Sequence, residues 1–190
     1  FTATDSDGDA IVINAGASVT IENDIPINNA ATVNLGTVHE DALNTAGAVG
    51  NSEGGQTVTA SITAAQIAAL VTAGADAPVA IALNAAVSGP SGLTQDGHAI
   101  NFVYDANSGV INGVVADGPN AGGVVFTIAP NGSDFTFTLK DNVDHGALDV
   151  GGGDAETTSL SLVNVFTATD SDGDAIVINA GASVTIENDI

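Results

Sequence analysis

The 25 residues Phe166–Ile190 read FTATDSDGDAIVINAGASVTIENDI, and the same 25 residues stand at Phe1–Ile25. The two copies are offset by 166 − 1 = 165 residues. A repeat at a fixed long period is typical of arrays in which one structural unit recurs. We therefore expect residues 26–190 to form one complete unit. Residues 1–25 would then be the C-terminal strands and linker of a preceding unit.

Short apolar runs separated by Gly, Asn and Asp recur through this segment and the rest of the chain, which predicts strands and turns. Phe135, Phe137 and Leu139 alternate with Thr136 and Thr138, as on a strand with one buried face. The pattern favours an all-β chain folded as an antiparallel β-sandwich. We expect strands at Ala10–Asn14, Ser18–Glu22, Ala31–Val38, Gln56–Ile62, Val79–Asn84, Ile100–Asp105, Val110–Ala116, Gly123–Ala129, Asp134–Lys140, Thr157–Thr169, Ala175–Asn179 and Ser183–Glu187.

One segment has helical rather than strand periodicity. Thr63 and Gln66 stand at the spacing of a capping box, and Ile67, Leu70 and Val71 then fall on one helical face. Gly74 is a natural C-terminal stop. We expect one short helix over about residues 64–73.

The charge balance excludes several classes of partner. Lys140 is the only basic side chain against 23 Asp and Glu residues, giving a formal net charge of −22. Binding to nucleic acid or to an anionic membrane surface needs Lys and Arg, so neither is expected of this segment. With a single cation in the chain, the carboxylates repel one another unless a divalent metal supplies positive charge. Oxygen ligands favour Ca²⁺.

The densest acidic motif is the loop Asp170-Ser171-Asp172-Gly173-Asp174, repeated as Asp5-Ser6-Asp7-Gly8-Asp9. Three carboxylates at alternating positions around a Gly can converge on one Ca²⁺ ion. The position of the Gly and the absence of a Glu at the twelfth position do not fit an EF-hand. An ordinary acidic β-turn is the alternative, because Asp and Gly are common turn residues.

A second acidic motif is Glu22-Asn23-Asp24-Ile25-Pro26, repeated as Glu187-Asn188-Asp189-Ile190. An acidic run before a Pro at a unit boundary is similar to the calcium linkers of tandem cadherin domains. Ca²⁺ held there would fix the angle between adjacent units. In the following unit we expect the additional ligands to be Glu40, Asp41, Asp141 and Asp144. The alternative is a solvated linker that binds no ion.

No arrangement of residues indicates an enzyme. Residues 50–54 match the letters of a G-x-S-x-G nucleophile elbow, but that motif lies between a strand and a helix. Here a loop precedes it and a predicted strand follows. The three His residues have no metal-ligand spacing, and Cys is absent. We expect a protein without catalytic activity.

The chain resembles the long repeats of giant RTX adhesins, which bacteria export through type I secretion. The resemblance rests on Phe135–Leu139, Val143-Asp144-His145, Leu160–Val165 and Phe166–Asp174, and is strongest over about residues 134–189. It implies an immunoglobulin-like extender domain that Ca²⁺ rigidifies outside the cell. It also implies Ca²⁺ ligands in the Asp170–Asp174 loop and at Glu187-Asn188-Asp189. The array would project terminal binding domains from the outer membrane, to which other parts of the protein anchor it, for adhesion and biofilm formation.

We therefore expect a calcium-stiffened extender repeat whose partners are adjacent repeats of the same chain, joined through calcium-bridged linkers. Two alternatives remain open. One is a carbohydrate- or protein-binding β-sandwich, for which Tyr104 is the only candidate to stack on a sugar ring. The other is a surface filament subunit that self-associates through residues 1–25, because either copy of the repeated segment can in principle complete the sheet of residues 26–165.

Overall fold

The computed structural model describes residues 1–16, 18–20, 23–43, 56–146 and 156–188. In these ranges the chain is all-β with one short helix, which confirms the expected fold class. Residues 50–54, Glu22 and Asp189 fall outside them. None of the helices in these ranges has the length and apolar character needed to cross a membrane.

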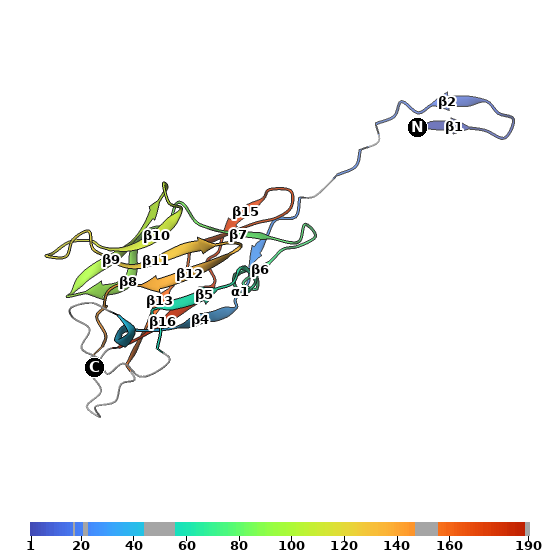
Figure 1. Cartoon of the computed structure of the whole chain (residues 1–190). Helices are drawn as coiled ribbons and strands as arrows, with labels where there is room; N and C mark the ends of the chain where they lie inside the picture. The colour runs from blue at the N-terminus through green and yellow to red at the C-terminus, as the bar shows by residue number, and fades with distance from the viewer. Residues whose placement is uncertain (17, 21–22, 44–55, 147–155, 189–190) are drawn as a thin grey trace.

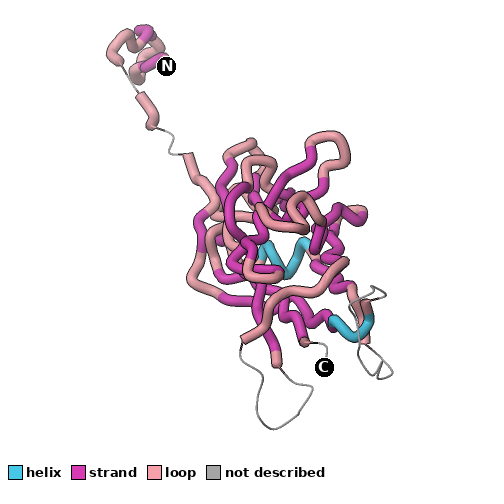
Figure 2. Tube along the Cα trace, turned by 90° about the vertical axis from the view of Figure 1, so that its left-hand side faces the viewer, coloured by secondary structure: helices cyan, strands magenta, loops and turns pink. Residues whose placement is uncertain are grey.

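Figure 1 shows a body from which an N-terminal hairpin projects. The hairpin consists of β1 (Thr2–Thr4) and β2 (Ala10–Val12), which pair only with each other among the described strands. The linker joins the body at one end, and the C-terminus lies at the other end in both Figure 1 and Figure 2. The linker and the C-terminus therefore leave the body at opposite ends.

One layer of the sandwich is a six-stranded antiparallel sheet in the order β5-β12-β11-β10-β9-β8. Its strands are β5 (Thr59–Ile62), β8 (Ser88–Gln95), β9 (His98–Asp105), β10 (Val110–Val115), β11 (Val124–Asn131) and β12 (Asp134–Leu139). Two of its strand pairs, β9–β10 and β11–β12, are antiparallel hairpins. The second turns tightly at Gly132, whose φ of +66° suits glycine.

The C-terminal copy of the repeated segment builds much of the other layer. Its strand β16 (Gly181–Glu187) lies between β13 (Thr157–Ser161) and β4 (Thr32–His39), antiparallel to the first and parallel to the second. A separate three-stranded sheet has the order β15-β14-β7, formed by β15 (Ala175–Val177), β14 (Phe166–Thr169) and β7 (Ala80–Leu83). The single strand expected over residues 157–169 is thus two strands, β13 and β14.

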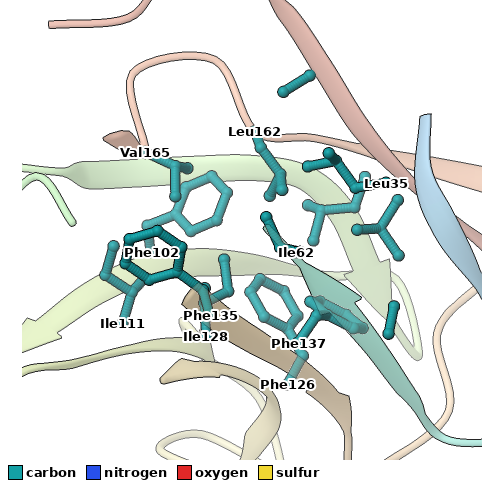
Figure 3. Close-up of a cluster of buried hydrophobic side chains, with 14 of the residues drawn as sticks. Leu35, Ile62, Phe102, Ile111, Phe126, Ile128, Phe135, Phe137, Leu162 and Val165 are labelled. Atoms are coloured by element: carbon teal, nitrogen blue, oxygen red, sulfur yellow. The ribbon is translucent and has the colours of Figure 1, made fainter. Parts of the chain in front are cut away.

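The core fills the space between these layers. Phe126 stacks on Phe137 with ring centroids 5.5 Å apart, and Phe102 meets Phe126 edge-on at 5.7 Å. Figure 3 shows Leu35 and Leu162 opposite the side chains of the six-stranded sheet. Burial of these aromatic and aliphatic residues is the main source of stability.

The helix is shorter than expected. α1 spans Ala64–Ala68, and its Thr63–Gln66 capping box is present, with the Gln66 amide bonded to the Thr63 hydroxyl and the Thr63 amide to the Gln66 side chain. The predicted continuation to residue 73 is wrong. Val71–Thr72 instead forms β6, which pairs with β3 (Ile27–Asn28) directly after the linker. This pairing satisfies backbone groups that a longer helix would have used.

Candidate metal centre

The Asp170–Asp174 loop connects β14 to β15 and closes on the carboxylate of its first residue. Asp170 Oδ1 accepts hydrogen bonds from the amides of Gly173 (3.1 Å) and Asp174 (2.8 Å). Gly173 has a φ of +105°, which glycine adopts without strain. In the N-terminal copy, Asp5 Oδ1 accepts likewise from the amides of Asp7 and Asp9, at 3.3 and 3.0 Å. Local sequence thus encodes a loop of the same type in both settings.

A fourth carboxylate approaches the C-terminal loop, and among the described residues the N-terminal loop has no counterpart to it. Asp76 lies in the turn between β6 and β7, and its carbonyl accepts from the amide of Ser171 at 3.1 Å. One carboxylate oxygen each from Asp76, Asp170 and Asp172 lies within 4.8 Å of the others. Asp76 was not predicted as a ligand, because it stands 170 − 76 = 94 residues before the loop in the sequence. The only local signal was an acidic residue in a turn bounded by Gly74 and Pro78.

Asp170 is 6% exposed, and its Oδ2 atom is buried without a hydrogen-bond partner. A buried anionic oxygen with no partner is costly unless a cation or a donor compensates for its lost hydration. Asp170 Oδ2 is therefore a buried oxygen whose lone pairs accept no hydrogen bond from the protein. This distinguishes it from a cluster of exposed acids. Asp5, Asp7 and Asp9 also converge, but all three are exposed.

The carboxylates in this cluster perturb one another. The pKa of Asp172 is raised, first by its hydrogen bond to Asp170, then by burial and by repulsion from Asp170, Asp174 and Asp76. Burial raises the pKa of Asp170, but hydrogen bonds from Asp172 and from backbone amides outweigh it and lower the pKa. The carboxylates of the cluster therefore repel one another, and a divalent cation placed among them would relieve that repulsion.

The linker from the N-terminal segment contacts the same group of loops. Asn23 Nδ2 donates to Asp174 Oδ2, and the amide of Ala75 donates to Asp24 Oδ2. A Cβ at Gly74 would overlap the Asp24 carboxylate, so the close approach requires glycine there. Asp24 is thus held beside the turn that carries Asp76.

The residues after the linker anchor it to the body. Asn28 donates through Nδ2 to the carbonyl of Val177 at 2.9 Å and accepts through Oδ1 from the amide of Asn179 at 3.0 Å. Pro26 is buried. Linker, turn and acidic loop therefore form one connected structure at this end of the body.

The expected ligands Glu40 and Asp41 lie elsewhere. They form a 3-10 helix, Glu40–Ala42, that follows β4, and β4 runs parallel to β16 with His39 beside Glu187. The structure therefore corrects one prediction: Asn23 and Asp24 meet the 74–76 turn and the 170–174 loop, while Glu40 and Asp41 lie near the second copy of the linker. The reason is the parallel pairing of β4 with β16, which places the ends of both strands at the C-terminal end of the body.

Glu40 and Asp41 are both buried. Glu40 Oε1 accepts from the amide of Val143 at 2.7 Å and lies 3.4 Å from His145 Nε2. Asp41 Oδ2 accepts from Gln56 Nε2 at 2.9 Å. Glu187 Oε1 is 3.9 Å from His39 Nε2. At this end of the body, the imidazoles of His39 and His145 therefore lie close to the carboxylates of Glu187 and Glu40, respectively.

Asp144 has its carboxylate oxygens occupied by hydrogen bonds, in contrast to Asp170. It accepts from the Thr94 hydroxyl (2.6 Å) and from the amides of Gly97 (2.8 Å) and Asp96 (2.9 Å). Burial raises the pKa of Asp144, but these bonds outweigh it and lower the pKa. Asp144 therefore ties its loop to the β8–β9 turn. Asp141 Oδ1 accepts from the adjacent amide of Asn142 at 3.0 Å.

Residues 22–24 and 187–189 are identical in sequence, and their described members have different surroundings. Asn23 and Asp24 contact the loops that contain Asp76, Asp170, Asp172 and Asp174. Glu187 lies at the end of the body that contains the buried Glu40 and Asp41. Of the linker residues, Asn23, Asp24, Glu187 and Asn188 are described, and Glu22 and Asp189 are not.

Comparison with known proteins gives one result. A family model described as Domain of unknown function (DUF5801) matches residues 34–181. No curated protein and no solved structure matches the chain.

Proposed function

The chain belongs to the DUF5801 family, and we propose that its residues 26–190 act as a calcium-stiffened, non-enzymatic extender repeat of a secreted bacterial cell-surface adhesin. The observation that carries the proposal is the contact of Asn23 and Asp24 with the loops in which Asp76, Asp170 and Asp172 converge. A linker that contacts an acidic cluster couples the ion content of that cluster to the angle between units.

The physical mechanism is electrostatic. With one basic side chain against 23 acids, the chain has almost no internal means of neutralising a carboxylate cluster. All candidate ligands are oxygens, which Ca²⁺ prefers, and extracellular calcium modules bind with Kd values on the order of 10⁻⁴–10⁻³ M. Bound Ca²⁺ would satisfy Asp170 Oδ2, offset the repulsion between Asp172 and its acidic neighbours, and hold Asp24 against the 74–76 turn. The repeat would be stiff outside the cell and loosely joined where calcium is scarce.

The resemblance to RTX adhesin repeats supports the wider role. It favours export by type I secretion, an extracellular location, and an array that projects terminal binding domains for adhesion and biofilm formation. The neighbouring repeats of the same chain are the partners, joined through calcium-bridged linkers. The opposite ends at which linker and C-terminus leave the body suit a unit that adds length to such an array (Figure 1).

The test is thermal unfolding in millimolar Ca²⁺ and in EGTA. We expect Ca²⁺ to raise the midpoint, because an ion that binds only the folded state stabilises it. Asp170→Asn should abolish most of the rise. Asp5→Asn is the matched control, because it makes the same change in the same sequence without the buried oxygen or Asp76. An unchanged midpoint in Ca²⁺ would rule out the proposal, and equal effects of the two variants would rule out the assigned site.

A binding role is a second candidate, and one observation favours it. Tyr104 lines an open cleft of about 310 Å³ together with Pro130 and Phe135. A tyrosine beside a proline and an aromatic ring can stack on the face of a sugar. Binding of the chain to a glycan array, lost on Tyr104→Ala, would place this role above that of a spacer.

A further inference from the structure

The outer face of the six-stranded sheet is free of charge along the middle of its strands. One row across the sheet, with one residue from each strand, consists of Ser88, Val103, Asn112, Thr127, Thr138 and Thr59. The acidic side chains of the six strands are Asp105 and Asp134, and both stand at strand ends. Because the whole chain has a net charge of −22, this face is a surface that a second copy can approach with little repulsion.

Four valines form an apolar patch on the same face. Val103 is 45% exposed and Val124 39%, and Val110 and Val114 are partly exposed. Val114 pairs with Val124, and Val103 lies opposite Asn112, diagonally between Val110 and Val114. Diagonal neighbours on one face of a sheet are within reach of each other. Exposed apolar residues that cluster in this way are typical of contacts between proteins.

The other layer of the sandwich has no such patch. On the outer face of β13 and β16, Ser159 lies opposite Thr185. Within Thr157–Ser161 and Gly181–Glu187, no large apolar side chain is exposed. The strand after the linker, β3, and the last strand, β16, both belong to other sheets. The valine patch is therefore particular to the six-stranded sheet and separate from the strands next to the linker and the C-terminus.

The two ends of this face carry opposite charges. Lys140 is the only basic side chain of the chain, is exposed, and forms no ion pair with any described residue. Asp134 and Lys140 alternate with the buried Phe135 and Leu139, so both lie on the outer face. They stand 140 − 134 = 6 residues apart in the sequence, which is about 20 Å along a strand. Asp105, at the tip of the β9–β10 hairpin, adds a second acid at the Asp134 end.

We propose that this face is a homotypic interface, and that its partner is the same face of a second copy of the chain running in the opposite direction. A two-fold axis that lies between the two sheets and crosses their strands places β12 of one copy antiparallel over β12 of the other. Lys140 of each copy then lies near Asp134 of the other copy. A two-fold axis along the strands would instead bring the acidic ends together, and like charges at an interface oppose binding.

The size of the face predicts a weak pair. Six strands spaced about 4.8 Å apart and about 20 Å long cover about 600 Å² on each copy, or about 1,200 Å² in total. This area is at the lower limit for stable interfaces and is typical of transient ones. Pairing buries no charge, because the middle of the face has none. In an array, many such contacts would act together and gain strength by avidity.

The opposite direction of the two copies bears on what the pairing can join. Arrays that project from two facing cell surfaces run in opposite directions, so this pairing would join cells rather than bundle arrays on one surface. That role rests on the proposed function. The pairing itself is a property of the single repeat and needs no calcium.

Sedimentation equilibrium of the full chain in EGTA tests the pairing. We expect the average mass of the wild type to rise from 18.5 kDa toward that of a dimer as concentration increases. Val103→Asp places a charge on the valine patch and should raise the dimer Kd at least about tenfold. Ser159→Asp is the matched control, because it adds the same charge to the outer face of the other layer, and it should change Kd by less than about twofold. Both positions are exposed, so both variants should keep the thermal midpoint of the wild type.

Carbodiimide coupling tests the orientation. The reagent joins an amine to a carboxylate as an amide and takes up the water that is lost, and Lys140 is the only lysine. In a mixture of isotope-labelled and unlabelled chains, mass spectrometry should find mixed-label cross-links from Lys140 to Asp134 or Asp105. Lys140→Arg keeps the charge, so this variant should still dimerise but give no such cross-link. The proposal is overturned if the wild type stays monomeric, if Val103→Asp and Ser159→Asp have equal effects, or if Lys140 couples to carboxylates elsewhere on the second copy.

Discussion

Replacement of Phe166 by Ala removes an aromatic ring from the C-terminal copy of the repeated segment. The same substitution can be made at the equivalent Phe1 of the N-terminal copy for comparison. Phe166 is 1% exposed, lies opposite Leu83 in the β14–β7 pair, and meets Phe135 edge-on with ring centroids 5.1 Å apart. Truncation of a buried Phe to Ala costs about 3–5 kcal/mol, and the lost edge-on contact with Phe135 contributes to that cost. We expect the free energy of unfolding to fall by about 4 kcal/mol.

Urea denaturation followed by circular dichroism measures this loss. With a slope of about 2 kcal/mol per molar urea, the midpoint should fall by about 2 M. The thermal midpoint should fall by about 8–16 °C.

Phe1→Ala is the internal control, because it makes the same substitution in the same 25-residue sequence. Phe1 is 92% exposed, so its truncation should change stability by no more than about 0.5 kcal/mol. Equal losses for the two variants, or a loss below about 1 kcal/mol for Phe166→Ala, would refute the assignment of the C-terminal copy to the core.

Three further outcomes can be checked on single variants. The pKa of Asp172 is raised in the folded state, so Asp172 favours folding below its unfolded pKa, and this stabilisation is lost as pH rises through the folded pKa. In EGTA at neutral pH we therefore expect Asp172→Asn to melt at or above the wild-type temperature. In millimolar Ca²⁺ this order should reverse, and a variant that melts below the wild type in both conditions would contradict the electrostatic argument. Asp144→Ala should lower the free energy of unfolding by about 1–2 kcal/mol in chemical denaturation, and this loss should shrink as pH falls through the lowered pKa of Asp144. Asp141→Ala should change the free energy of unfolding little in the same assay. Gly113→Ala should cost about 1–3 kcal/mol in the same assay, because a Cβ there would overlap the ring of Phe126.

The strands with regular alternation could be predicted from the sequence, and those governed by distant contacts could not. β12 alternates Phe and Thr, and its bounds, Asp134–Leu139, are within one residue of the prediction. β8, Ser88–Gln95, was missed because Gly89, Pro90 and Gly92 have the composition of a turn. It is an edge strand with a register shift after Pro90, where a missing amide is tolerated.

The repeated segment shows the same limit within one sequence. Residues 18–20 form no strand, whereas the identical residues 183–185 lie in β16. The hairpin forms in both copies because its own bonds hold it, and the following strand forms only where β13 and β4 flank it. Asp76 has the same explanation, since its place beside Asp170 results from the pairing of β7 with β14. Local pattern predicted the acidic loop, and tertiary pairing added its fourth carboxylate.

The parallel pairing of β4 with β16 also determines how the unit responds to tension. A force applied between the two termini pulls on β4 from its N-terminal end, through the linker, and on β16 from its C-terminal end. Because the strands run in the same direction, these forces slide one strand past the other and load all six registered residue pairs together. The β9–β10 hairpin, pulled apart at its open end, would instead break its bonds one after another. Single-molecule stretching through the termini should therefore need a higher force than stretching across that hairpin.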